Sequence, residues 1–150
     1  FFGQNFGSGK IERLYEARLV LTRFCITLGL VLAALLFMLS GPLTALFSES
    51  ESIRSVARSY LWIVPVSYGA YGLVMSVNAG FNGMGKPIPG VVISTMRVMV
   101  LFLPLAFLGR WLFDLQGMFA ASTISNLVLG LAGFLWLGRQ IGHSVQKESN

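Results

Sequence analysis

The sequence predicts an all-α integral membrane protein with four antiparallel transmembrane helices. Only 11% of its 150 residues are charged, whereas a soluble domain carries about a quarter. The charges also lie far apart, and residues 24–48, 59–85 and 115–138 contain none. Each of these runs is long enough to cross the ~30 Å apolar core of a bilayer as a helix. A fourth apolar segment, 88–108, is interrupted by one charge, Arg97.

The charge-free runs and the turn residues between them place the four helices. The expected spans are about 19–47, 56–80, 88–108 and 115–137, within a membrane region of 19–138. We expect the first helix to end near Gly41-Pro42 and Pro65 to kink the second, because proline removes a backbone donor from the helix. The connections at 81–90 and 109–117 are short, so consecutive helices must be antiparallel neighbours.

The basic residues predict the orientation of the chain in the membrane. If the N-terminus is cytoplasmic, seven Lys and Arg residues lie inside and three lie outside, as the positive-inside rule favours. Both termini are therefore expected in the cytoplasm. Residues 1–18 would form a cytoplasmic loop and an amphipathic lead-in at the interface, and 139–150 a polar cytoplasmic tail. Without an initiator Met, the chain is expected to be the C-terminal piece of a longer protein.

Several function classes find no support in the residues. The net charge of +5 comes from basic residues at the ends of apolar runs, so membrane topology explains it and no nucleic-acid partner is expected. The single Cys25 and single His143 provide no metal-ligand set. No catalytic Ser-His-Asp set, phosphate-binding loop or paired intramembrane carboxylate is present. We expect neither an enzyme nor a metal site.

Arg97 is the first candidate functional residue. It lies about 14 Å from either end of its span at helical rise, where a charge costs roughly 3 kcal/mol on insertion scales. Two interpretations remain open. Arg97 lines a pathway or pairs with an acid elsewhere in the protein, or it is a structural residue that bonds backbone carbonyls or snorkels to the interface from a shifted span. No Asp or Glu lies in any of the four spans.

The second span carries two distinct helix faces. Polar, aromatic and Met residues at spacings of 3, 4, 3 and 4 share one face. These candidates for a substrate cavity are Tyr68, Tyr71, Met75, Asn78 and Asn82. The alternative is that the asparagines bond neighbouring helices and the tyrosines are interfacial. Gly69, Gly72, Ser76 and Gly80 form a second, small-residue face for close helix packing. Asn126 in the fourth span is expected to make an interhelical hydrogen bond.

Four motifs in order resemble those of the multidrug and toxic compound extrusion (MATE) transporters. Gly3-Gln-Asn-Phe-Gly-Ser-Gly-Lys10 resembles the family's G-Q-N-x-G-A-G-K, and Tyr60-Leu-Trp-Ile-Val-Pro-Val-Ser-Tyr68 its Y-L-x-I-x-P-x-S-Y. Asn78-Ala-Gly-Phe-Asn-Gly-Met-Gly-Lys-Pro87 is similar to the N-A-x-F-N-G-x-G-K-P link, and Ile93-Ser-Thr-Met-Arg97 with the later Pro104-Leu-Ala106 to the next helix. The similarity covers nearly the whole chain.

The resemblance implies that the four spans are helices nine to twelve of a twelve-helix transporter. It implies a secondary-active antiporter in a bacterial or archaeal plasma membrane, which exports amphipathic or cationic organic compounds in exchange for sodium ions or protons. The implied partners are the lipid bilayer, drug-like substrates and the N-terminal helices of the same protein, and no organic cofactor is implied. Some members place a coupling carboxylate on the helix that matches the second span. This sequence has none there, so the cation-binding residues are expected outside the chain.

Two alternatives to the antiporter remain. A flippase for lipid-linked precursors, from the same superfamily, would have a more cationic central cavity, for which Arg97 is the only local sign. A non-transporting membrane scaffold would tolerate Arg97→Ala and Asn78→Ala without loss of cellular function.

Overall fold

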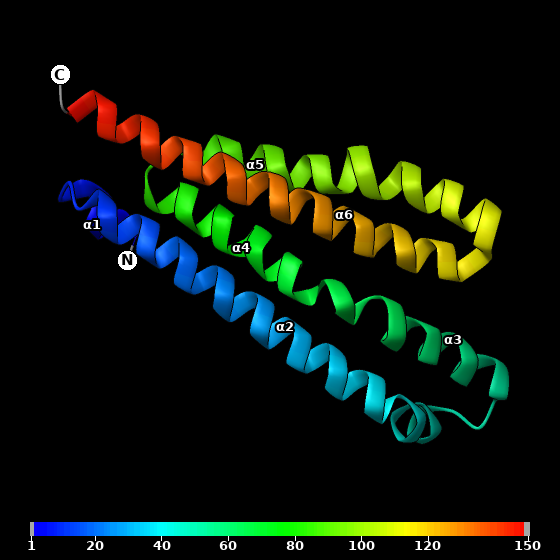
Figure 1. Cartoon of the computed structure of the whole chain (residues 1–150). Coiled ribbons are helices and arrows are strands. Elements are labelled where there is room, and N and C mark those ends of the chain that lie inside the picture. The colour runs from blue at the N-terminus through cyan, green and yellow to red at the C-terminus, as the bar shows by residue number, and fades with distance from the viewer. Residues whose placement is uncertain (1, 149–150) are drawn as a thin grey trace.

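The fold of the chain is all-helical in a computed structural model, which describes residues 2–148, without the side chains of Ile11 and residues 144–148. The described residues form α1 (Phe2–Gly7), α2 (Ile11–Phe47), α3 (Glu51–Ile63), the short 3₁₀ turn η1 (Pro65–Ser67), α4 (Tyr68–Gly83), α5 (Pro87–Thr95), the π-helical segment η2 (Met96–Phe102) and α6 (Leu103–Glu148). Figure 1 shows these elements as long rods lying side by side, with both chain ends at the same end of the bundle.

The first long helix begins earlier than expected and passes through the proline that was expected to end it. It begins at Ile11, so the lead-in before residue 19 is continuous with the membrane span rather than a separate interfacial segment. It also continues through Pro42 to Phe47, and the predicted end near Gly41-Pro42 is wrong. The hydroxyl of Thr44 bonds the carbonyls of Ser40 (2.7 Å) and Gly41 (3.1 Å). Pro42 withholds the amide that would bond the carbonyl of Met38, four residues earlier, and the helix continues past this gap.

The second span consists of α3 and α4, joined by η1. Pro65 opens η1, where the α-helical ladder is interrupted for one short turn, as the predicted kink at this residue requires. Helix α4 ends at Gly83, and Gly85 adopts a φ of 69° in the turn that follows. Glycine takes this left-handed conformation without steric cost, so it allows the tight connection to α5.

The third and fourth spans are continuous in helical structure except at one reversal. Phe113 and Asp114 have non-helical backbone angles inside α6, and Asp114 has a φ of 53°. Gly109 and Gly117 lie against each other across this reversal, because neither has a side chain to hold the backbones apart. In Figure 1 the chain turns back on itself here, at the end of the bundle opposite the termini. The third span therefore comprises α5, η2 and the first part of α6, and the fourth the rest of α6.

Helix α4 holds the centre of the bundle, where it packs against α2, α5 and α6. Most of its small-residue face packs closely on α2: the backbones of Gly69 and Gly29 are in direct contact, and Gly72 lies against Cys25, whereas Gly80 lies against Leu137 and Phe2. Gly130 of α6 lies against the carbonyl of Ala70 on another side of α4. Small residues thus set the close approach of these helices, as in other membrane bundles.

The outer surface of the bundle is apolar over most of its length. Three helical stretches of the described residues are long and apolar enough to cross a membrane, namely Glu12–Phe47, Glu51–Gly83 and Pro87–His143. The last of these contains the reversal at Phe113 and Asp114, so it corresponds to two passes. Large apolar side chains such as Met38 (77% exposed) and Phe107 (76% exposed) face outward. An all-α membrane architecture accounts for this surface.

Candidate functional site: a polar layer between α4, η2 and α6

Arg97 lies in the π-helical segment η2, inside the bundle rather than at a membrane surface. Its Nη1 donates a hydrogen bond of 3.1 Å to Oδ1 of Asn126 in α6. Its guanidinium carbon lies 5.0 Å from the ring centroid of Tyr71 in α4, within the range of cation–π attraction. Its Nε is buried and has no hydrogen-bond partner. Arg97 thus joins three helices and retains an unused donor.

Asn126 extends this contact to the break in the second span. Its Nδ2 donates a hydrogen bond of 3.0 Å to Oγ of Ser67, the last residue of η1. The Ser67 hydroxyl in turn donates to the carbonyl of Val64, at 2.9 Å. Both Asn126 and Ser67 are buried. The interhelical hydrogen bond predicted for Asn126 is therefore confirmed.

The backbone around Pro65 is satisfied from the same direction. Thr123, one turn before Asn126 in α6, donates a hydrogen bond of 3.0 Å to the carbonyl of Ile63. The amide of Ser67, four residues after Ile63, bonds the carbonyl of Val64 at 3.0 Å in the 3₁₀ turn, so it does not supply the α-helical bond to Ile63. Two polar side chains of α6 therefore bond the irregular turn of the second span, where an unpaired group in apolar surroundings would cost several kcal/mol.

Asn78 makes a second polar contact, about two turns along α4 from Tyr71. Its Nδ2 donates a hydrogen bond of 2.8 Å to Oγ of Ser94 in α5. Its Oδ1 is buried without a partner and lies near Gly90. This contact agrees with the interpretation that an asparagine of this face bonds a neighbouring helix.

The remaining cavity candidates lie at different levels of α4. Tyr71, whose ring lies beside the guanidinium of Arg97, is 37% exposed. Met75, about one turn later in α4, is 46% exposed. Tyr68 is half-buried in the first turn of the helix. Asn82 is exposed in the last turn of the helix. The structure therefore brings Tyr71, Arg97, Asn126 and Ser67 together, and it does not gather all six predicted residues around one enclosed space.

The charge of the layer has no counter-ion among the described residues. Their one side-chain ion pair joins Arg54 and Glu51, at 3.8 Å near the start of α3. Arg97 therefore pairs with an amide and an aromatic ring rather than with a carboxylate. No group of three or more metal-ligating side chains occurs among the described residues. The layer offers one positive charge, amide and hydroxyl groups and an aromatic face, which suit the binding of a polar group of an amphipathic molecule.

The sequence reasoning missed three members of these networks, Ser67, Ser94 and Thr123. Serine is common in membrane helices as a small packing residue, so its type alone gave no signal. The position of Ser67 two residues after Pro65 was the available clue, because a proline in a membrane helix creates carbonyls that need partners.

Comparison with known proteins places this fold in a family. The model of the MatE family matches residues 1–108. The FAD transporter of Shewanella oneidensis is 30% identical over 146 residues, which are 97% of this chain and 32% of that protein. A Bacillus subtilis protein named "Probable multidrug resistance protein YoeA" is 26% identical over 156 aligned residues, with 97% of this chain and 33% of that protein covered. The chain thus spans about a third of the length of these relatives.

Solved structures show the same arrangement of helices. The Vibrio cholerae MATE transporter VcmN in its bent form superposes with a TM-score of 0.90 and 24% identity, over 95% of this chain and 33% of that one. An inward-facing structure of a multidrug resistance MATE family transporter gives a TM-score of 0.88 at 24% identity, over 97% of this chain and 34% of that one. The family match over 1–108, on a fold shared with these transporters, establishes that the chain belongs to the MatE family.

Proposed function

We propose that this chain is the C-terminal four-helix part of a multidrug efflux antiporter, which exports amphipathic or cationic organic compounds in exchange for sodium ions or protons. The observation that carries the proposal is the polar layer around Arg97, built into otherwise apolar helices of a MatE-family chain. A charge at this depth is costly, so membrane proteins keep such residues mainly where they line a pathway or bind a ligand.

The proposed mechanism is alternating access, in which this four-helix unit moves largely as a rigid body. The unit resembles an inward-facing and an outward-facing MATE family structure equally well, with TM-scores of 0.88 and 0.89. Close glycine contacts such as Gly29 with Gly69 support this rigidity, because tightly packed backbones cannot slide past one another without clashes. Substrate would bind where this unit faces the rest of the transporter.

The coupling cation is proposed to bind outside this chain. All six acidic residues of the sequence lie beyond the four expected spans. Sodium ions and protons both require oxygen ligands or a titratable group, and a membrane carboxylate is the usual one. We therefore assign cation binding to the helices that precede this chain in the complete transporter. We place the protein in the cytoplasmic membrane, with the end that holds both termini inside.

A second candidate substrate is an anionic amphiphile. Arg97 has no carboxylate partner among the described residues and carries a buried, unpaired Nε. A phosphate or pyrophosphate group would supply its missing acceptor. The relative in Shewanella oneidensis is named a FAD transporter, and a flippase for lipid-linked precursors would handle the same anionic chemistry.

The test is an export assay in cells that express the complete transporter. Arg97→Ala should reduce export at least tenfold while the amount of protein in the membrane falls less than twofold. Arg110→Ala is the matched control, because this substitution removes the same charge from an exposed position near the reversal. Equal loss of export and membrane protein would make Arg97 purely structural. Unchanged export would refute a role of Arg97 in transport, and a lack of export by the wild type would favour a non-transporting scaffold.

The same cells can separate the two substrate classes. Export of a cationic dye and of a flavin dinucleotide should be compared in the wild type and in Arg97→Ala. Loss of dinucleotide export alone would support the anionic candidate, and loss of dye export would support the cationic one. Vesicles with an imposed sodium or proton gradient then identify the coupling ion.

A further inference from the structure

A basic pocket lies between α2 and the last turns of α6, far from the polar layer around Arg97. It has a volume of about 470 Å³, and its walls include Tyr15 and Arg18 of α2 and Arg139 and His143 of α6. Arg18 and Arg139 are the charged residues that border the first and fourth expected spans. The pocket therefore lies at the depth where a bilayer places its headgroups.

Two glycines of α6 shape the pocket. Gly138 lies directly against the guanidinium of Arg18, and its carbonyl accepts a hydrogen bond of 3.4 Å from the Tyr15 hydroxyl. Gly142, one turn later, leaves room for the same hydroxyl. The guanidinium carbon of Arg18 also lies 3.6 Å from the ring centroid of Phe134. Arg18 is thereby held in place at the mouth of the pocket, with its Nε buried and unpaired.

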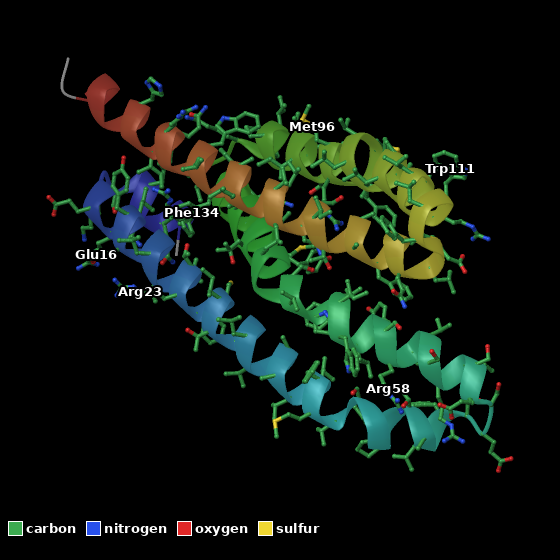
Figure 2. The ribbon with its side chains drawn as sticks, turned by 45° about the vertical axis from the view of Figure 1, so that its right-hand side comes forward. Glu16, Arg23, Arg58, Met96, Trp111 and Phe134 are labelled. Carbon is green, nitrogen blue, oxygen red and sulfur yellow. The ribbon has the colours of Figure 1, made fainter. Side chains whose placement is uncertain are left out.

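The pocket lining contains no acidic residue. Glu12 and Glu16, the acidic residues of this part of α2, lie about 120° and 160° from Arg18 around the helix. Figure 2 shows Glu16 and Arg23 on the side of α2 turned away from α6, whereas Phe134 lies between the two helices. Arg18 and Arg139 thus line one pocket without a carboxylate, and guanidinium groups match phosphate oxygens in pairs.

An apolar groove continues from the pocket along the same two helices. It has a volume of about 560 Å³ and is lined by Ile26 and Leu30 of α2, Leu73 of α4, and Leu131 and Phe134 of α6. Phe134 connects the two spaces, because its ring contacts Arg18. From Thr22 to Leu30 the groove extends about 12 Å along α2 at helical rise, close to one leaflet of a ~30 Å apolar core.

We propose that this composite site binds one anionic phospholipid, with its phosphate on Arg18 and Arg139 and an acyl chain in the groove. The charge of the pocket matches the phosphate, and the apolar groove matches the chain in length and chemistry. A phosphate alone would use only the first part, and a neutral lipid only the second. The bound lipid would tie α2 to α6 at the end of the bundle where both chain termini lie.

The test measures the thermal unfolding of the complete purified transporter in detergent. Phosphatidylglycerol should raise the melting temperature, whereas phosphatidylcholine and glycerol phosphate at the same concentrations should not. Arg139→Gln should lose more than half of the shift. Arg23→Gln is the matched control, because it removes an exposed arginine from the opposite face of α2, and it should keep the full shift.

A second pair of variants tests the acyl groove. Leu131 is 60% exposed in the groove, so Leu131→Trp should fill the groove and reduce the shift at least twofold. Val128, on the same helix and 47% exposed, is outside the groove lining and gives the control Val128→Trp. Equal shifts with phosphatidylcholine, equal losses in the test and control variants, or a full shift with glycerol phosphate alone would each overturn the proposal. The last result would identify a site for soluble phosphate.

Discussion

The hydrogen bond between Arg97 and Asn126 gives a quantitative test of the polar layer. Asn126→Ala removes the bond from Arg97 Nη1 (3.1 Å) and the bond to Ser67 Oγ (3.0 Å). A hydrogen bond to a charged group contributes about 1.5–3 kcal/mol, and interhelical bonds in membranes average about 0.6 kcal/mol. We therefore expect Asn126→Ala to lower the free energy of unfolding by about 2–3 kcal/mol.

A double-mutant cycle isolates the Arg97 share of this loss. Arg97→Met alone removes the cost of a charge in the membrane, roughly 3 kcal/mol on insertion scales, so its effect on stability can have either sign. The cycle cancels this cost, because it appears in both arms. When Arg97→Met is combined with Asn126→Ala, the coupling free energy between the two residues should be about 1.5 kcal/mol. Denaturant titration of the complete transporter in mixed micelles measures it.

Ser125→Ala is the control for the cycle. Ser125 is adjacent to Asn126 and buried, but its hydroxyl bonds the carbonyl of Ala121 in its own helix, at 2.7 Å. Its effect should add to that of Arg97→Met within about 0.5 kcal/mol, as for independent sites. If Asn126→Ala also proved additive with Arg97→Met, the charge would not depend on Asn126, and the polar layer would not be an energetic unit.

Two further substitutions test the packing. Gly69→Val should cost about 3 kcal/mol or prevent folding, because a Cβ there would lie 2.9 Å from the carbonyl oxygen of Cys25; Gly41→Ala, which meets nothing within 4 Å, should be neutral or stabilising by up to about 1 kcal/mol. Fluorescence-detected gel filtration reports the folded fraction, and equal behaviour of both variants would contradict the close contact. Trp62→Phe should cost about 1 kcal/mol in thermal unfolding, because it removes the 2.9 Å bond to Ser40 and keeps the aromatic packing. No change would show that this bond contributes nothing.

The membrane class and the helix pairing follow from the sequence because both depend on composition over long stretches. The charge-free runs required helices, and short connections such as 109–117 required antiparallel neighbours. The expectation that proline interrupts a helix holds at Pro65 and fails at Pro42. A hydroxyl bonds carbonyls beside both prolines, Thr44 at Pro42 and Ser67 at Pro65, so neither the proline nor a neighbouring hydroxyl predicts by itself where the helix is interrupted.

The site was harder to predict because it depends on how three helices align. The spacing of residues 68–82 correctly placed them on one face of a helix, but spacing cannot show which neighbour each level of that face meets. The search for a partner of Arg97 considered carboxylates and backbone carbonyls, and the structure provides an amide, Asn126. The π-helical form of Met96–Phe102 leaves no mark in composition, since it reflects one extra residue per turn rather than a residue type.

The π-helical segment Met96–Phe102 also bears on how this helix tolerates the insertion or deletion of a residue. A π turn holds one residue more than an α turn, so the segment can be regarded as an insertion that the helix absorbed without breaking. Deletion of one exposed residue there, such as Met99, could be accommodated by a return to α-helical bonding. The same deletion in the α-helical part of the fourth span would rotate every later side chain by about 100°. Natural insertions and deletions should therefore concentrate in Met96–Phe102, the segment that contains Arg97. There they would change the direction of the charged side chain and leave the packing of the other helices intact.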